Sequence, residues 1–322
     1  MSNIYLFSPS GAIRDKKGFK RGVSLLKSMG HNVEVDPNAL SAFQRFAGDD
    51  PTRLEAIERA AHSGADVAMV TRGGYGLTRL LPQIKYSSIK KAIKAGTEFI
   101  GFSDFTAFQA AVFAKTGCRT WAGPTLMDDL AAETPDELML NCLNDFLLGR
   151  GEGTGWYMKS KVLTSFLEHS PAKFSKSGYL AKSSTLWGGN LTVLCSLIGT
   201  PFFPQIKGGI LFLEDVAEHP YRIERMLDQL MNSGVLASQK AIILGQFNRY
   251  KLNSHDKGFN LNGVVERLRE RLKIPVLSDL PFGHVDIKVC LPVGQEVDLY
   301  RDQSDVLILW NDEHHHHGHS HS

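Results

Sequence analysis

The chain has 322 residues, of which 43% are hydrophobic and 22% charged, with a formal net charge of +2 at pH 7. This length favours two domains over one core, and so small a net charge argues against nucleic acid or a membrane surface as partner. No run approaches the roughly 20 apolar residues of a membrane span, and the first residues lack the pattern of a signal peptide. The four cysteines are far apart and form no C-x-x-C pair, which indicates reduced thiols. These features predict a cytoplasmic protein.

The first part of the chain alternates short apolar runs with amphipathic helical patterns. Strands are expected at 3–9, 31–36 and 97–104, and 66–76 is expected to be a buried strand that runs into a glycine-rich turn. Helical segments are expected at 15–30, 49–65, 77–84 and 105–117. Asp50 followed by Pro51 is the start signal of the second helix. This alternation predicts a parallel sheet with helices on both faces, whose functional loops follow the carboxyl ends of the strands. Both "TRGGYG" (71–76) and "GFSD" (101–104) fall at such ends.

The composition changes near Gly149, where the segment 149–156 holds four glycines in eight residues. Such a segment is typical of a domain boundary or a crossing loop. Beyond it we expect a turn and a helix at 184–204, a helix at 221–236, and strands at 208–216, 240–247, 275–284, 296–300 and 305–310. The predicted organisation is an N-terminal α/β domain (1–150), a linker (151–175), a strand-rich C-terminal domain (176–310) and a histidine-rich tail (311–322). We interpret the tail as an appended segment that binds divalent metals whatever the fold does.

Ser103 and Asp104 lie where a strand gives way to a helix. Both residue types are favoured helix caps, so capping is one interpretation. The other is that Ser103 is a nucleophile on a tight turn, although "GFSDF" lacks the second glycine of the G-x-S-x-G pattern. The glycine run Gly73–Gly76 is equally open. It fits a plain turn, a phosphate cradle, or backbone N–H groups that stabilise an oxyanion.

A serine nucleophile needs a base, and the base needs an orienting acid. Among the six histidines before the tail, His284 differs because it directly follows a glycine at the end of a strand-like run. Glu214 and Asp215 end an apolar strand, where an ionisable pair is costly unless it faces a cleft. Taken singly, a loop histidine is usually solvated and acids at a strand end are usually caps.

Six blocks of sequence carry a resemblance to a known family. They are "TRGGYG", "GFSDFTA", "LWGGNLTVL", "GTPFFP", "GGILFLEDVAEHPYRIERML" and "LPFGHV…LPVG". In order and spacing they resemble the LD-carboxypeptidases, which are cytoplasmic serine peptidases of murein recycling and relatives of the microcin C immunity peptidases. The resemblance covers residues 3–310. It implies an α/β fold with a flavodoxin-like parallel-sheet domain followed by a strand-rich, barrel-like α/β domain.

The resemblance also implies the parts of an active site. Ser103 would be the nucleophile, His284 the base and Glu214 the orienting acid, and the backbone amides of Gly74 and Asp104 would form the oxyanion hole. The two domains would then have to meet at the site, as ligand sites often require. The implied substrate is a murein tetrapeptide that loses its terminal D-alanine, with no metal or other cofactor. A homodimer is expected, without nucleic acid or membrane as partner.

A carboxypeptidase must also recognise a free carboxylate, most simply through a basic side chain or backbone amides. Arg72, beside the glycine turn, and Lys288, four residues after His284, are the candidates. Two other functions stay open. One is cleavage of an aminoacyl-nucleotide amide by the same triad, which the lack of a long insertion disfavours. The other is a two-domain protein that binds a peptide or nucleotide without reacting.

Overall fold

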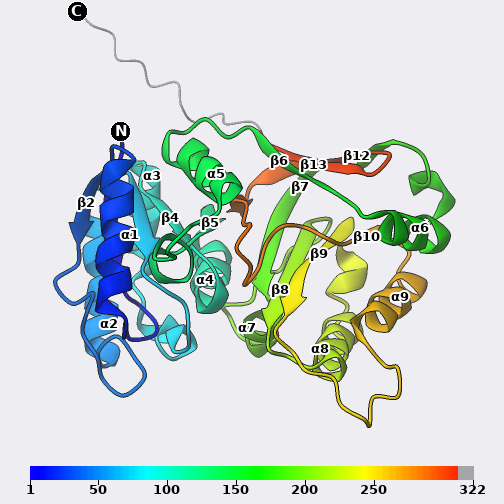
Figure 1. Ribbon diagram of the computed structural model, residues 1–322, viewed down its shortest axis with the longest axis horizontal. Coiled ribbons are helices and arrows are strands. Elements are labelled where there is room, and N and C mark those ends of the chain that lie inside the picture. Colours follow the sequence, from blue (N-terminus) through cyan, green and yellow to red (C-terminus); the bar gives the residue numbers. More distant parts are fainter. Residues whose placement is uncertain (311–322) are drawn as a thin grey trace, which may run out of the picture.

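The structure is a computed structural model that describes residues 1–310, and it contains two sheets that lie side by side (Figure 1). The metal-binding prediction for the histidine-rich tail falls on residues 311–322 and so lies outside the described residues. The first sheet has the order β11-β5-β4-β3-β1-β2. Its strands are β1 (Asn3–Phe7), β2 (Asn32–Val35), β3 (Val67–Val70), β4 (Glu98–Gly101), β5 (Thr120–Ala122) and β11 (Leu291–Val293). Strands β1 to β5 pair in parallel in the flavodoxin-like order 2-1-3-4-5, and β11 is antiparallel to β5.

Helices cover both faces of this sheet, because successive side chains of a strand point to opposite faces. Ile4 and Leu6 of β1 belong to one apolar cluster, whereas Tyr5 and Phe7 belong to another. The helices are α1 (Lys16–Ser28), α2 (Asp50–His62), α3 (Tyr86–Lys94), α4 (Thr106–Thr116) and α5 (Glu137–Leu147). The first cluster includes side chains of α1, α5 and a π-helical turn, η4 (Leu126–Leu130), and the second includes side chains of α2, α3 and α4.

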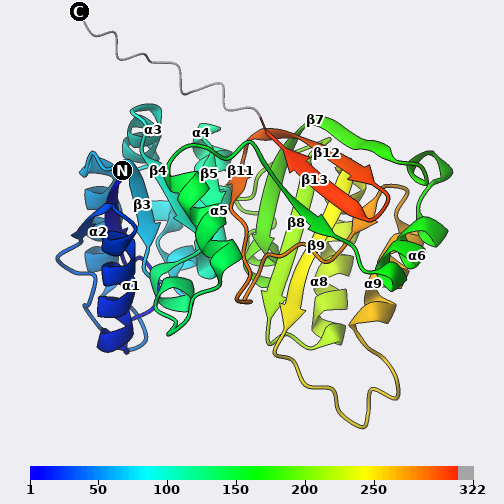
Figure 2. The ribbon, with the colours of Figure 1, turned by 45° about the horizontal axis from the view of Figure 1, so that its top comes forward.

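The second sheet is mixed and has the order β10-β9-β8-β7-β12-β13-β6. Its strands are β6 (Gly153–Tyr157), β7 (Gly178–Asn190), β8 (Ile210–Val216), β9 (Ala241–Asn248), β10 (Val276–Leu277), β12 (Glu296–Asp302) and β13 (Asp305–Leu309). Figures 1 and 2 show β12 and β13 crossing beside the β7–β9 strands rather than lying flat with them. The Trp156 Nε1–H on β6 donates to the Ser278 carbonyl just after β10 at 2.9 Å. The two ends of the sheet therefore approach each other, as in a barrel.

The helices of the second half are α6 (Ser160–His169), α7 (Leu191–Ser196), α8 (Pro220–Asn232) and α9 (Leu261–Arg271). Helix α8 packs between α7 and α9, and α6 packs against α9. Short 3-10 turns complete the described chain: η1 (Leu77–Arg79), η2 (Leu81–Gln83), η3 (Ser103–Phe105), η5 (Ala172–Phe174) and η6 (Leu236–Ser238). No helix within residues 1–310 is long and apolar enough to cross a bilayer.

The structure differs from the sequence-based expectations in several places. Residues 151–175, expected to be a linker, carry β6 and α6, and β11 returns from the second half to the first sheet beside β5 (Figure 2). The turn expected at the start of 184–204 is instead the end of β7. Of 275–284, only β10 is a strand. The helix expected at 77–84 is split into η1 and η2, where Pro82 removes a backbone donor.

The start of α2 lies one residue earlier than its sequence signal suggests. Asp49, not Asp50, is the N-cap, and its carboxylate accepts the Thr52 N–H at 2.9 Å. Asp50 lies within the first turn and binds Arg53 at 2.6 Å and Arg79 at 2.8 Å.

Candidate active site

Ser103 lies at the corner between β4 and α4, in the turn η3. Its φ is +64°, which is uncommon for a residue with a Cβ and which is typical of strain held at functional sites. A nucleophile elbow places its serine on such a strained strand-to-helix turn. Neither η3 nor α4 has a side-chain cap hydrogen bond, so Ser103 and Asp104 do not act as caps of the helix that follows.

His284 lies between Ser103 and Glu214. Its Nε2 is 3.2 Å from the Ser103 Oγ, and its Nδ1 is 2.9 Å from Glu214 Oε2. When the Nδ1–H donates to the Glu214 carboxylate, Nε2 is left to accept the proton of the serine hydroxyl. The three side chains, which come from the turn η3, from β8 and from the loop before β11, thus have the arrangement of nucleophile, base and orienting acid.

The two adjacent acids at the end of β8 share one partner, Asn190, and differ in their other partners. Glu214 is fully buried and faces His284, and its second oxygen accepts the Asn190 Nδ2–H at 3.1 Å. Asp215 also accepts an N–H of Asn190 Nδ2 at 3.1 Å, but its other oxygen accepts the backbone N–H and the hydroxyl of Thr192 at 2.9 and 2.7 Å. Burial, reinforced by the neighbouring Glu214 charge, raises the pKa of the Asp215 carboxyl above its usual value. Glu214 is therefore the acid that contacts the base, and Asp215 fastens β8 to α7.

The glycine turn after β3 passes directly beside the serine. A Cβ on Gly73 would lie 2.7 Å from Ser103 Cβ and 2.8 Å from its Oγ, so no larger residue fits there. Gly74 has a φ of +116°, a conformation that favours glycine. Within residues 1–310, no hydrogen-bond partner is found for the N–H groups of Gly74 and Asp104. Two unpaired amides near the nucleophile can receive a developing oxyanion.

The Asp104 side chain joins three segments around the serine. Its Oδ2 accepts the Ser10 hydroxyl at 2.8 Å and the Leu77 N–H at 3.0 Å. Burial raises the pKa of the Asp104 carboxyl, although both hydrogen bonds act in the opposite direction. The sequence analysis missed this role because Ser10 and Leu77 lie far from Asp104 along the chain.

The two candidates for carboxylate recognition lie in different surroundings. Arg72 is partly buried and its Nη1–H donates to the Ala12 carbonyl at 3.1 Å, while its buried Nε has no partner among the described residues. Lys288 is only 1% exposed, and its ammonium already lies 2.5 Å from Asp129 Oδ1. Lys288 is therefore not a free surface cation, and a substrate contact is a prediction that we keep for Arg72.

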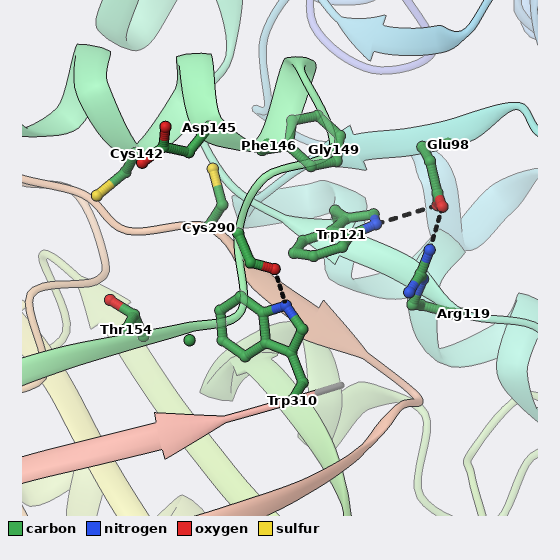
Figure 3. Close-up of a pocket in the computed structure, with 12 residues that line it drawn as sticks. Glu98, Arg119, Trp121, Cys142, Asp145, Phe146, Gly149, Thr154, Cys290 and Trp310 are labelled. Atoms are coloured by element: carbon green, nitrogen blue, oxygen red, sulfur yellow. Dashed lines mark hydrogen bonds and ion pairs between the residues drawn. The ribbon is translucent and has the colours of Figure 1, made fainter. Parts of the chain in front are cut away.

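A cavity of about 80 Å³ lies beside β5, α5 and β11 (Figure 3). Its walls include Trp121, Cys142, Phe146, Cys290 and Trp310, and no member of the Ser–His–Glu set lines it. The Nε1–H groups of both tryptophans are already bonded, one to Glu98 and the other to the Gly151 carbonyl. No group of metal-ligating side chains is found in the described part of the chain. The cavity therefore holds no member of the proposed triad.

Comparison with known proteins matches both halves of the chain to one family. Residues 4–123 match the model of the LD-carboxypeptidase N-terminal domain, and residues 183–299 match that of the LD-carboxypeptidase C-terminal domain. All of the residues discussed for the nucleophile, the acid and the base fall within these two ranges.

Individual relatives agree over nearly the whole length. A putative carboxypeptidase of Synechocystis is 31% identical over 95% of this chain and 94% of its own. The crystal structure of a muramoyltetrapeptide carboxypeptidase from Oxalobacter formigenes is 36% identical and has a TM-score of 0.83, covering 96% of this chain and 99% of that one. The microcin C7 self-immunity protein MccF of Escherichia coli is 26% identical over 95% of this chain and 92% of its own.

Proposed function

Because the chain belongs to the LD-carboxypeptidase family of serine peptidases, we propose that it releases the terminal D-alanine from murein tetrapeptides. The observation that carries the proposal is that one histidine contacts both Ser103 Oγ and Glu214 Oε2, at 3.2 and 2.9 Å. The similarity to a muramoyltetrapeptide carboxypeptidase supports the choice of substrate. A role in peptidoglycan recycling in the cytoplasm goes with this proposal.

In the proposed mechanism, Ser103 Oγ attacks the carbonyl carbon of the bond to D-alanine while His284 Nε2 takes the hydroxyl proton. The carbonyl oxygen becomes an oxyanion that accepts hydrogen bonds from the Gly74 and Asp104 amides. His284 then gives its proton to the leaving amine, and D-alanine departs. Water, deprotonated by the same histidine, hydrolyses the acyl-enzyme. Glu214 keeps the imidazole in the required tautomer throughout.

Recognition of the free carboxylate of D-alanine is assigned to Arg72. A guanidinium suits this task because it offers several N–H donors in one plane. Arg72 lies next to Gly73 in the turn that passes the nucleophile, and its Nε is without a partner in the described chain. We also propose that the protein acts as a homodimer, and that neither nucleic acid nor a membrane is its partner.

The similarity to MccF supports a second candidate function, the cleavage of an aminoacyl-nucleotide amide by the same triad. A protein that binds without reacting is less well supported, since the strained Ser103 and its contact with His284 would then have no purpose.

Incubation of the protein with a murein tetrapeptide, followed by mass spectrometry, tests the proposal directly. We expect tripeptide and D-alanine, with a terminal L-alanine analogue cleaved poorly. Equal rates on the two stereoisomers would count against the assignment. Release from an aminoacyl-nucleotide but not from the tetrapeptide would favour the second candidate.

A further inference from the structure

The segment that follows the base crosses from one half of the molecule to the other. It leaves His284, passes through Lys288 and enters the first sheet as β11. Lys288 is buried in this crossing, and its Nζ lies 2.5 Å from Asp129 Oδ1 of η4. The ion pair therefore joins the base-bearing segment to the half that carries the nucleophile.

The same ammonium lies against the residue that precedes the nucleophile. Lys288 Nζ is 3.5 Å from the centre of the Phe102 ring, a cation–π contact in a buried setting. The centres of the Phe102 ring and the His284 imidazole are in turn 4.9 Å apart. Phe102 thus lies between the lysine and the base while its backbone leads directly into Ser103.

Asp129 continues the connection to the glycine turn. Its second oxygen accepts the Thr125 N–H at 2.7 Å, and the Thr125 hydroxyl donates to Asp128 at 3.2 Å. Asp128 accepts the Gly73 N–H at 3.4 Å, and the Met127 N–H donates to the Thr71 carbonyl at 2.7 Å. The turn that carries Gly74 is therefore held by the element that binds Lys288.

We propose that Lys288 is a positioning residue which, through Asp129 and Phe102, sets the place of His284 relative to Ser103 and the oxyanion turn. The nucleophile and the base come from segments 181 residues apart along the chain, so their separation depends on how the two halves are held together. Removal of one partner leaves the other buried charge unpaired, which displaces the groups around it. A misplacement of about 1 Å at a reacting group can cost on the order of 100-fold in rate.

The test is K288M, which keeps a long apolar stem and removes the charge. We expect kcat for D-alanine release to fall about 10- to 100-fold while KM changes less than about twofold. The rate of Ser103 labelling by a fluorophosphonate should fall by the same factor, because labelling needs the activated serine but no substrate. K288R should recover part of both rates.

The matched control is R59M, which removes the guanidinium that binds the buried Asp36 at 2.8 Å, away from the triad. It should lower the melting temperature but leave kcat and the labelling rate unchanged. A K288M protein that is folded by circular dichroism and labels at the wild-type rate overturns the inference. A K288M protein in which only KM rises also overturns the inference, because that result would indicate that Lys288 binds the substrate carboxylate.

If K288M does not fold, the double variant K288M/D129L replaces the whole ion pair by apolar side chains, a change that is often tolerated. It should also label slowly, and wild-type labelling would overturn the inference. The kcat readout rests on the proposed function, whereas the labelling readout does not. Wild-type protein that labels at Ser103 but releases no D-alanine would refute the proposed substrate and leave Lys288 testable.

Discussion

At the scale of single residues, the imidazole of His284 touches both other members of the proposed triad, so their effects on rate should not be independent. Ser103→Ala and His284→Ala should each lower kcat by roughly 10⁴-fold or more, about 5 kcal/mol at 1.36 kcal/mol per decade. The double variant should be little slower than either single one. Glu214→Gln should cost less, because it misorients the base without removing it. Steady-state rates of D-alanine release measure all four.

Thermal unfolding provides the control for this set. Loss of a cap costs about 1 kcal/mol, but the Ser103 hydroxyl contacts His284 and caps no helix. Ser103→Ala should therefore melt close to the wild-type temperature. If Ser103→Ala lowers the free energy of unfolding by about 1 kcal/mol and retains turnover, Ser103 has only a structural role.

A second prediction at this scale concerns Gly73. In Gly73→Ala the new methyl group would lie 2.8 Å from Ser103 Oγ and force the nucleophile aside, with a loss of about 100-fold or more in kcat. Gly263→Ala is the matched control, because its Cβ would meet nothing within 4 Å on α9. It should leave kcat unchanged and raise stability by about 0.5–1 kcal/mol through helix propensity. Equal activity of the two variants would contradict the geometry of the glycine turn.

At the scale of elements, local patterns predicted most of the first sheet. Apolar runs and helical periodicity indicate β1 to β4 and the helices α1, α2 and α4, since these signals depend only on nearby residues. Helix α3 is not among the expected elements. The sequence predicts a turn at the start of 184–204, but this stretch is the end of β7 and contains Gly188 and Gly189. In the structure a Cβ on Gly188 would lie 1.9 Å from the Phe212 carbonyl oxygen, so the glycine permits close strand pairing. Such a contact between distant residues has no local signature, and neither has the pairing of the three-residue strand β11.

The ion pair between Asp36, just after β2, and Arg59 of α2 leads to a prediction about how stability depends on pH. Asp36 lies just after β2, and its buried carboxylate accepts hydrogen bonds from Arg59 at 2.8 and 3.0 Å and from Tyr5 at 2.8 Å. Burial alone would raise the pKa of Asp36, but these hydrogen bonds outweigh it and hold the pKa below the usual value. The contribution of Asp36 to the free energy of unfolding is therefore fully present above the pKa of about 3.9 that an aspartate has in the unfolded chain. It is lost as the pH falls through the lower pKa that Asp36 has in the folded protein.

Asp36→Asn should accordingly lower the free energy of unfolding by about 1–3 kcal/mol at pH 7. The difference from wild type should shrink as the pH falls below about 4. Glu55→Gln is the control, because the exposed Glu55 lies 3.6 Å from the same guanidinium and a surface ion pair contributes about 0–1 kcal/mol. Urea titrations across this pH range give both values, and a gap that widens in acid would contradict the assignment.

At the scale of the whole molecule, the proposed site brings together side chains from both halves of the chain. Ser103, Glu214 and His284 could be singled out from the sequence, because each lies in a block typical of the family. The structure brings the three side chains into contact, and their catalytic roles are part of the proposal. The choice between Glu214 and Asp215 came from the family resemblance, since adjacent residues at the end of a strand look alike without their partners. The burial of Lys288 could not be predicted at all, because Asp129 and Phe102 are remote in sequence.

The described chain contains no group of metal-ligating side chains, so metal ions bound by the tail should not affect catalysis. Protein ending at Asp312 is expected to keep full D-alanine release in excess chelator. Assays with and without chelator, on both the full chain and the shortened one, measure this. Activity that chelator abolishes and zinc restores would contradict the serine mechanism.

The return of β11 to the first sheet has a consequence for synthesis of the protein. Strand β5 ends at Ala122, but its neighbour β11 ends at Val293, 171 residues later. At 5–20 residues per second the ribosome needs roughly 10–35 s to bridge that interval. During this interval β5 is an additional unpaired edge strand of the sheet, a surface prone to pairing with other chains. The nascent protein also carries Ser103 without His284, so under the proposed mechanism it has no hydrolytic activity until residue 284 has been synthesised.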